Sequence, residues 1–266
     1  MIKLTVYLFN LTLRCHHDRI LERAAGLTYR VILAFFPFLV FLMSLVGTLD
    51  LDESAALEGL FFVLPGDIAA LVANFLYELG DTASAGIMST ALFFSVYNSS
   101  NGFRAIIRIS NHAYGIEDRR SFPAQVGLSF LLMLLFSVAL LLMLGLLVFG
   151  RQILGFFFPY GTELFFAISS GALALLILIS IMVIIYKIAC ATPMPPRHIL
   201  PGAIFAVLAW VIISAGFGFV ISNFTQYSAI YGSIAGVFIL MLWLNIVCIV
   251  LLIGNEMNAV LREYYP

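Results

Sequence analysis

Residues 198–255 read HILPGAIFAVLAWVIISAGFGFVISNFTQYSAIYGSIAGVFILMLWLNIVCIVLLIGN, a run of 58 residues without Asp, Glu, Lys or Arg. A helix crosses the ~30 Å hydrocarbon core of a bilayer with ~20 apolar residues, so this run is too long for one span. Its middle, SNFTQYS at 222–228, is polar enough for a turn. The run therefore predicts two membrane-spanning helices, at 200–221 and 232–253.

Four more apolar stretches precede this pair, and each is long enough for a transmembrane helix. They predict helices at 31–49, 82–103, 124–149 and 164–186. The sequence lacks the segments of about ten residues with alternating polarity that mark membrane β-barrels. The expected fold is all-α, a single polytopic transmembrane domain over residues 1–266 with six transmembrane helices.

The composition of the whole chain agrees with a lipid environment. Hydrophobic residues make up 63% of the chain and charged residues 10%, whereas a soluble domain carries about 25% charged residues. So little charge could not cover a globule of this size, which excludes a soluble enzyme, a disordered protein and a secreted disulfide scaffold. With 13 basic against 14 acidic residues, a nucleic-acid binder with a basic surface is excluded too.

The distribution of charges predicts which side of the membrane each loop faces. With six spans both termini share a side, and placing them in the cytoplasm leaves only Arg151 of the 13 basic residues outside. Eight of the 14 acids lie outside, so the net charge is +6 inside (12 basic, 6 acidic) and −7 outside (1 basic, 8 acidic). By the positive-inside rule we expect a multi-pass membrane protein with cytoplasmic N- and C-termini.

Two segments beyond the six spans also carry a helical pattern. Residues 1–30 predict a cytoplasmic amphipathic helix on the membrane surface, with four Arg on one side and Leu and Ile residues on the other. Residues 50–81 predict an acidic outer loop with seven acids and no base, in which apolar stripes flank Pro65-Gly66. We expect short helices there, packed on the outer end of the bundle.

Motifs for catalysis are absent from the sequence. It has no glycine-rich phosphate loop, no His-Glu-x-x-His, no Cys-x-x-Cys and no Gly-x-Ser-x-Gly. The four His are scattered, without the clustered His or carboxylates that a metal-dependent nuclease needs. We expect no enzyme, no metal and no cofactor. No Cys falls in an outer loop, so no structural disulfide is expected.

Polar residues at membrane depth are costly to bury and are therefore the candidate functional residues. One group occupies the inner half of span 82–103 and the residues after it: Asn98, Ser99, Asn101, Arg104 and Arg108. The two Arg share a helix face, and the group could receive an anionic headgroup or substrate from the cytoplasm. Interhelical hydrogen bonds, with Arg side chains that snorkel to lipid phosphates, explain the pattern equally well.

A second group lies in the last span and at its inner end, and consists of Asn245, Asn255 and Glu256. Glu256 could pair with Arg104 or Arg108 in a gate-like cluster that faces the first group. The alternative is a helix-end carboxylate in the headgroup zone. Both groups together are the candidate substrate-binding residues.

Three further positions suit helix packing rather than chemistry. Pro37 is expected to kink the first span. Gly232 and Gly236 place small residues four apart, which lets another helix approach closely. The short loops and this small-residue face also leave surface for a homodimer.

Four segments of the chain, 24–47, 110–122, 196–210 and 231–261, resemble the YihY/BrkB family of bacterial inner-membrane proteins. The resemblance implies six helices and cytoplasmic termini. It also implies the bacterial inner membrane. Family members have been linked to serum resistance and to envelope lipid or lipopolysaccharide export, and have carried the label ribonuclease BN. Arg30 departs from the family, which favours an aromatic or polar residue there. The matching positions are Tyr29, Pro37, Tyr114, Gly115, Pro201, Gly202, Tyr231, Gly232, Gly236, Gly254, Glu256 and Asn258.

Three functions are open at this point. The first expectation is a transporter-like protein that exports or translocates a lipid or amphiphilic anion, with membrane lipids as its partners and no nucleic acid. The second is a non-transporting envelope scaffold or assembly factor that acts through the acidic outer loop 50–81. A ribonuclease comes third, because the sequence lacks the residues for it.

Overall fold

The chain is described by a computed structural model that covers residues 2–48, 64–82, 85–158, 161–222 and 233–264. Every regular element in this part of the chain is a helix, which confirms the predicted all-α class. The helices are α1 (Ile2–His17), α2 (Ile20–Thr48), α4 (Gly66–Thr82), α5 (Ala85–Ala113), α6 (Phe122–Phe157), α7 (Glu163–Ala189), α8 (Pro196–Ser222) and α10 (Ser233–Tyr264).

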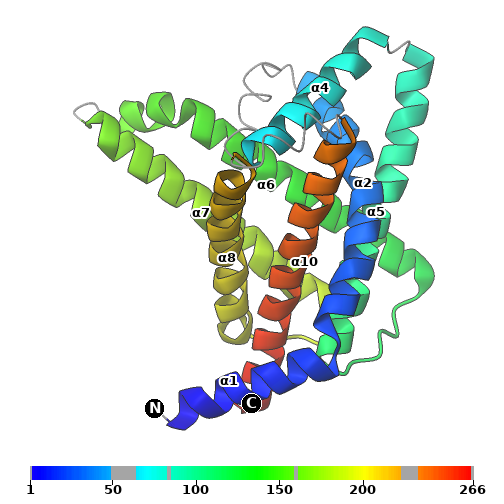
Figure 1. The fold of residues 1–266 in the computed structure, drawn as a ribbon, viewed down its shortest axis with the longest axis vertical. Coiled ribbons are helices and arrows are strands. Elements are labelled where there is room, and N and C mark those ends of the chain that lie inside the picture. The colour runs from blue at the N-terminus through cyan, green and yellow to red at the C-terminus, as the bar shows by residue number, and fades with distance from the viewer. Residues whose placement is uncertain (1, 49–63, 83–84, 159–160, 223–232, 265–266) are drawn as a thin grey trace.

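Within the described residues, five helices are long and apolar enough to cross a membrane: α2, α6, α7, α8 and α10. The sixth predicted span is α5, which has 29 residues and is therefore roughly 44 Å long. It runs beside α2 (Figure 1), but polar and Arg residues in its second half lower its hydropathy. All six predicted spans are thus helices, and α5 is the least apolar of them.

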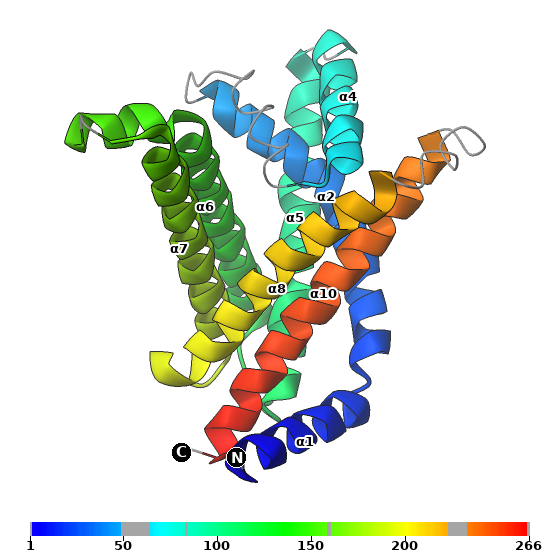
Figure 2. The same cartoon turned by 60° about the vertical axis from the view of Figure 1, so that its left-hand side comes forward.

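Six of the helices form a closed ring. Each packs against the next in the order α2, α5, α6, α7, α8, α10 and back to α2. The pairs α2/α5, α6/α7 and α8/α10 are antiparallel, and the α6/α7 hairpin leans away from the other four helices at one end (Figure 2). Exposed apolar side chains cover the outside of the ring, among them Leu164 of α7, Ile212 of α8 and Leu242 of α10. An outer surface of this kind suits contact with lipid.

The remaining two helices lie at opposite ends of the ring. Helix α1 crosses one end, where the N- and C-termini also lie, and this end is called the terminal end below (Figures 1 and 2). Helix α4 covers the other end, called the α4 end. Its buried Ile68 and Val72 pack in one core cluster with Leu39 of α2 and with Leu240 of α10. The described part of segment 50–81 is therefore a packed helix.

The N-terminal segment differs from the single helix expected over residues 1–30. Helix α1 ends at His17, and α2 begins at Ile20. Arg19 between them has φ 49°, a left-handed conformation that is uncommon for a residue other than glycine. Asp18 is buried at this turn. The turn lets α1 lie across the bundle end while α2 rises into the ring, which a continuous helix could not do.

Most of the helices extend beyond the predicted spans at the terminal end. Helix α2 starts 11 residues before residue 31, α5 continues ten residues past 103, and α10 continues to Tyr264 rather than ending at 253. The predicted bounds reflect the uncharged runs and the roughly 20 residues that cross the hydrocarbon. Charge ends the hydrocarbon-spanning part of a helix, whereas the backbone hydrogen bonds continue into the polar zone.

The predicted packing residues have separate positions. Pro37 lies inside α2. Gly236 of α10 faces α4, since a Cβ placed on it would lie 2.5 Å from Leu71 Cδ1. Gly232 and residues 50–63 of the predicted outer loop lie outside the described residues.

Candidate functional site

A cavity of about 300 Å³ lies at the centre of the ring, and side chains from all six ring helices line it. This volume holds roughly ten groups the size of a water molecule. Along α2 the lining runs from Leu27 to Leu42, a rise of roughly 22 Å. The cavity is therefore elongated along the direction in which the ring helices run.

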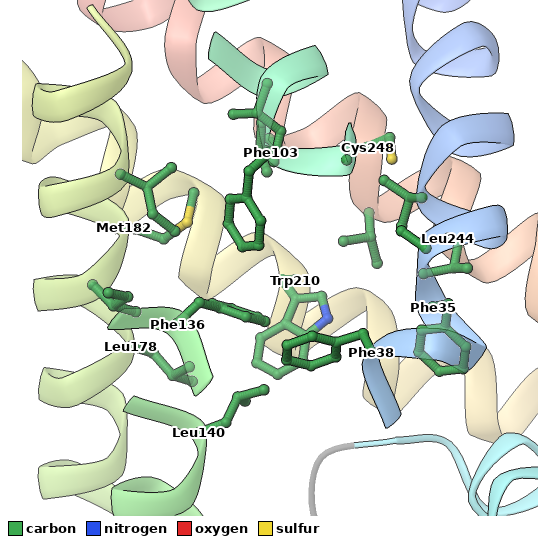
Figure 3. Close-up of a pocket in the computed structure, with 18 of the residues that line it drawn as sticks. Phe35, Phe38, Phe103, Phe136, Leu140, Leu178, Met182, Trp210, Leu244 and Cys248 are labelled. Atoms are coloured by element: carbon green, nitrogen blue, oxygen red, sulfur yellow. The ribbon is translucent and has the colours of Figure 1, made fainter. Parts of the chain in front are cut away.

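The lining of the cavity is apolar throughout. Figure 3 shows Phe38 of α2, Phe103 of α5 and Phe136 of α6 converging on it, with Trp210 of α8 and Met182 of α7 around them. The Phe136 ring lies 5.8 Å from both the Phe38 and the Phe103 ring, centroid to centroid. Its described residues include no Asp, Glu, Lys, Arg, His, Asn or Gln. Such a surface suits hydrocarbon, because it offers ordered water few hydrogen-bond partners.

The ring is held tightly together where the cavity ends, toward the terminal end. The Tyr186 hydroxyl of α7 donates a hydrogen bond to the Leu251 carbonyl of α10 at 2.7 Å. Gly202 of α8 and Gly254 of α10 meet backbone to backbone, since a Cβ on Gly254 would lie 2.6 Å from the Gly202 oxygen. The Gly202 N–H donates to Asn258 Oδ1 at 2.8 Å. Helices α7, α8 and α10 are thus in direct contact with one another on the terminal-end side of the cavity.

The end of α5 is fastened to the α7–α8 connection in the same layer. The buried Asn111 amide donates to the Ala189 carbonyl at 3.1 Å, and its oxygen accepts the Ala191 N–H at 2.7 Å. Arg120 donates to the Cys190 carbonyl at 2.9 Å. Gly115, with φ 63°, lets the chain turn out of α5, a conformation that favours glycine. The segment at 110–122 therefore closes the ring at the terminal end.

A cluster of charged side chains attaches α1 to this end. Arg14 Nε of α1 lies 3.1 Å from Glu256 Oε2 of α10, and its other nitrogens reach Glu263 Oε1 at 2.5 Å and the Ala113 carbonyl of α5 at 2.6 Å. Glu256 is almost completely buried. Partial burial disfavours the charged guanidinium, but the hydrogen bond to Glu263 and the nearby carboxylates outweigh this and raise the Arg14 pKa.

Asp18 extends the cluster at the turn between α1 and α2. Its carboxylate lies 3.6 Å from Arg23 and 3.4 Å from the His112 ring of α5. Arg23 also contacts the His112 ring nitrogen at 2.5 Å. Cys15 lies in the same region, and burial, with the Glu256 and Asp18 carboxylates, raises its pKa to about 11.

The cavity and the predicted polar residues do not coincide. None of the seven candidate substrate-binding residues with a described side chain is among the residues that line it. Asn245 donates to the buried Thr28 hydroxyl of α2 at 3.1 Å. Asn98 and Asn101 are half-buried, and nothing is described for the Ser99 side chain.

The charged and terminal-end candidates lie elsewhere. Arg104 lies over the Phe122 ring, with 5.5 Å between its Cζ and the ring centroid, and Arg108 is exposed. Asn255 and Glu256 are buried in the terminal end. The ion pair of Glu256 is formed with Arg14, not with Arg104 or Arg108.

Sequence reasoning missed Arg14, Asp18, Asn111 and Tyr186 as structural partners at the terminal end. Arg14 and Glu256 are far apart in the chain, and the pattern of residues 1–30 marks Arg14 only as one basic side chain among four. A signal for Asn111 was present, because it lies in the segment 110–122 that carries the family resemblance. Within the described residues, no three His, Cys, Asp or Glu side chains come together in a way that could hold a metal ion.

Comparisons with known proteins show the family of this chain. The family model "Virulence factor BrkB" matches residues 11–266. A "putative ribonuclease-like protein YfkH" of Bacillus subtilis (strain 168) is 33% identical over 247 residues, which cover 91% of this chain and 90% of that one. A "UPF0761 membrane protein" of Tolumonas auensis is 27% identical over 261 residues, 94% of this chain and 83% of that one. No solved structure matches. The chain is thus a membrane protein of the virulence factor BrkB family.

Proposed function

We propose that this protein binds the hydrocarbon part of a membrane amphiphile inside the six-helix ring and moves the molecule across or out of one leaflet. The observation that carries the proposal is the apolar cavity of about 300 Å³ to which all six ring helices contribute. Apolar cavities of at least this size are typical ligand sites. Among the described residues, the lining offers no charged or amide side chain to a charged metabolite, which supports an amphiphile whose polar group lies outside the cavity.

The proposal also rests on the contrast between the two ends of the cavity. Toward the terminal end, the Gly202–Gly254 contact and the Tyr186 hydrogen bond hold three helices together. Toward the α4 end, the α6/α7 hairpin leans away from its neighbours (Figure 2). A transporter must open a route to its site from one side at a time, and helices that separate at one end are the usual means.

The first test fills the cavity without changing the outer surface. Leu178 of α7 lines the cavity, whereas Leu176 of the same helix is exposed on the outside. We expect Leu178→Trp to lower retention of a fluorescent long-chain amphiphile by purified protein by about ten-fold, because the indole takes the ligand's volume. The matched control Leu176→Trp is expected to bind as the original protein does.

Translocation is then measured in liposomes with a head-labelled lipid whose label can be quenched from outside. The expected result is that protein-dependent loss of fluorescence occurs with the original chain and the Leu176→Trp variant, and falls with Leu178→Trp. Thermal unfolding of each variant is measured in parallel. A folded Leu178→Trp protein that binds and translocates normally would contradict the proposal, and binding without translocation would reduce it to a lipid-binding protein.

We further propose that the terminal end faces the cytoplasm, as the charge distribution indicates. Arg151 and Glu163, which form an exposed ion pair at the α6–α7 turn, would then lie outside. In a chain without its native Cys, Arg151→Cys is expected to react with a membrane-impermeant maleimide in intact cells. Arg119→Cys, at an exposed position of the α5–α6 connection, is expected to react only after permeabilisation. The reverse result would invert the topology.

The proposal assigns no catalytic role to the chain. Ribonuclease activity of the purified protein with added divalent metal, abolished by one point substitution, would overturn this part of it. The printed name of the Bacillus subtilis relative makes that assay worthwhile.

A further inference from the structure

Three arginines of α2 and α5 come together on the outer face of the ring. The two helices are antiparallel (Figure 1). Gly102 of α5 lies opposite Ala34 of α2, since a Cβ on Gly102 would lie 3.4 Å from Ala34 Cβ. Arg30 is one turn from Ala34 toward the terminal end, and the corresponding turn of α5 lies between Arg104 and Arg108. Arg30 and Arg104 both exert a repulsive electrostatic effect on Arg108, which agrees with this register.

Among the described residues, none of the three arginines forms an ion pair, whereas Arg14, Arg23 and Arg120 nearby each have an acidic partner. Three like charges on adjacent turns destabilise one another. A bound anion would relieve this repulsion, and arginine binds phosphate through several parallel hydrogen bonds.

The side chains around the three arginines match the apolar and charged parts of a phospholipid. Going from the arginines toward the α4 end, the same face of α5 carries Tyr97 and Phe93, and Leu33 follows Arg30 on α2. These three apolar side chains are exposed on the outside of the ring. The face therefore changes from apolar to strongly basic along the direction of the helices, as a phospholipid changes from its acyl chains to its phosphate.

The start of α6 adds to the basic end of this face. Phe122, its first residue, lies beneath the Arg104 guanidinium. The N-terminus of a helix carries a positive partial charge and free backbone N–H groups. This field has the same sign as that of the arginines.

We propose that Arg30, Arg104 and Arg108 bind the phosphate of an anionic phospholipid on the outer face of α2 and α5. This site is distinct from the cavity, because none of the three arginines lines it. The site extends the proposed function, because it names an anionic phospholipid as the amphiphile that reaches the ring. Only this link to transport rests on the proposed function. Binding of the phosphate itself is independent of transport.

Native mass spectrometry of the purified full-length protein tests the site, with phosphatidylglycerol and phosphatidylcholine of identical acyl chains as probes. We expect the original chain to retain phosphatidylglycerol preferentially. Each arginine near an anionic lipid contributes about a five-fold preference, so Arg30→Gln/Arg108→Gln is expected to lower the phosphatidylglycerol-to-phosphatidylcholine ratio by about 25-fold. Both positions are exposed, and Arg30→Lys/Arg108→Lys is expected to keep most of the preference.

The matched control is Arg119→Gln, which removes one exposed arginine that also has no ion pair among the described residues. Its lipid ratio is expected to change by less than about two-fold. An unchanged ratio in the double Gln variant, or an equal loss in the control, would overturn the site. Displacement of phosphatidylglycerol by inorganic phosphate at constant ionic strength would overturn the lipid assignment and leave a site for free phosphate.

The cavity variant separates this inference from the proposed function. Leu178→Trp is expected to lose the cavity ligand and keep the phosphatidylglycerol preference, while the double Gln variant keeps the cavity ligand. If only Leu178→Trp changes the lipid ratio, the arginine site is wrong. If the arginine variants change the ratio while the cavity binds nothing, the site stands and the proposed function fails.

Discussion

Gly202→Ala is expected to destabilise the protein strongly, whereas Gly216→Ala in the same helix is expected to be neutral or slightly stabilising. A Cβ on Gly202 would overlap the Gly254 carbonyl oxygen of α10 and the Asn258 side chain. A Cβ on Gly216 would meet nothing within 4 Å. Both substitutions add one methyl group to α8, so the difference between them measures the α8–α10 contact alone.

The expected change in stability depends on which atoms must move to make room for the added methyl group. Added methyl groups in a packed core cost about 1–3 kcal/mol, and the obstacle at Gly202 is mainly backbone, so we expect about 3 kcal/mol or more. At Gly216, alanine is expected to stabilise the helix by at most about 1 kcal/mol. Thermal unfolding in detergent, followed by the fluorescence of Trp210 and Trp243, measures both. Equal unfolding temperatures would show that α8 and α10 do not meet at this point.

This contact also bears on the proposed function. Gly202 lies one turn from the cavity-lining Ala206, and Gly254 lies close to the cavity-lining Leu251. Separating α8 from α10 here would open the cavity toward the terminal end. A destabilised but folded Gly202→Ala protein is therefore expected to lose its cavity ligand faster than the Gly216→Ala protein.

Much of the fold could be predicted because lipid imposes a simple constraint. Any segment that crosses the membrane must satisfy its backbone internally and present about 20 apolar residues. Runs such as 124–149 and 164–186 therefore appear in the structure as α6 and α7. The turn at Asp18 and Arg19 could not be found this way, because it lies in the polar zone, where the hydropathy constraint no longer applies.

The site was harder to predict for a related reason. Polar residues at membrane depth are the candidates that the sequence offers, because they are costly to bury there. The cavity is lined by ordinary apolar residues such as Leu178 and Val207, which look the same in sequence as core residues. Helix order around the ring is also absent from the hydropathy pattern. Asn245, one of the candidate substrate-binding residues, forms an interhelical hydrogen bond with Thr28.

Arg151 and Glu256 are exceptions to the predicted distribution of charge across the membrane, and in the structure each has an ionic partner from another helix. Arg151, the one basic residue on the predicted outer side, pairs with Glu163 across the α6–α7 turn at 2.6 Å. Glu256, the acid among the predicted inner bases, pairs with Arg14 from the other end of the chain. The first pair is exposed and the second is buried, so we expect them to differ greatly in their effect on stability.

Arg14→Ala is expected to destabilise the protein by about 2–3 kcal/mol, and Arg151→Ala by about 0.5 kcal/mol or less. Removal of one partner leaves Glu256 buried without compensation, which costs about 3–5 kcal/mol in fully buried pairs. The Arg14 side chain is 22% exposed, so we expect a smaller value. The Arg151–Glu163 pair has side chains 69% and 72% exposed, and exposed pairs contribute little whatever their distance.

A double-mutant cycle shows whether the loss comes from the Arg14–Glu256 pair. Arg14→Ala/Glu256→Gln is expected to be more stable than the sum of the two single variants predicts, by about 2 kcal/mol. Additive effects would mean that Arg14 acts only through Asp18, Glu263 and the Ala113 carbonyl. Thermal unfolding in detergent provides the four values.

Cys15 reports whether α1 stays attached when Arg14 is removed. Its pKa is raised to about 11 by burial and by the Glu256 and Asp18 carboxylates, while Arg14 acts in the opposite direction. Maleimide reacts with the thiolate, so labelling at neutral pH is expected to be slow in the original chain. With Cys190 and Cys248 replaced by Ala, detachment of α1 in the Arg14→Ala variant is expected to speed labelling at least about ten-fold. If α1 stayed attached, loss of the arginine would raise the Cys15 pKa further and labelling would slow down, so the direction of the change alone decides whether Arg14 holds α1 on the ring.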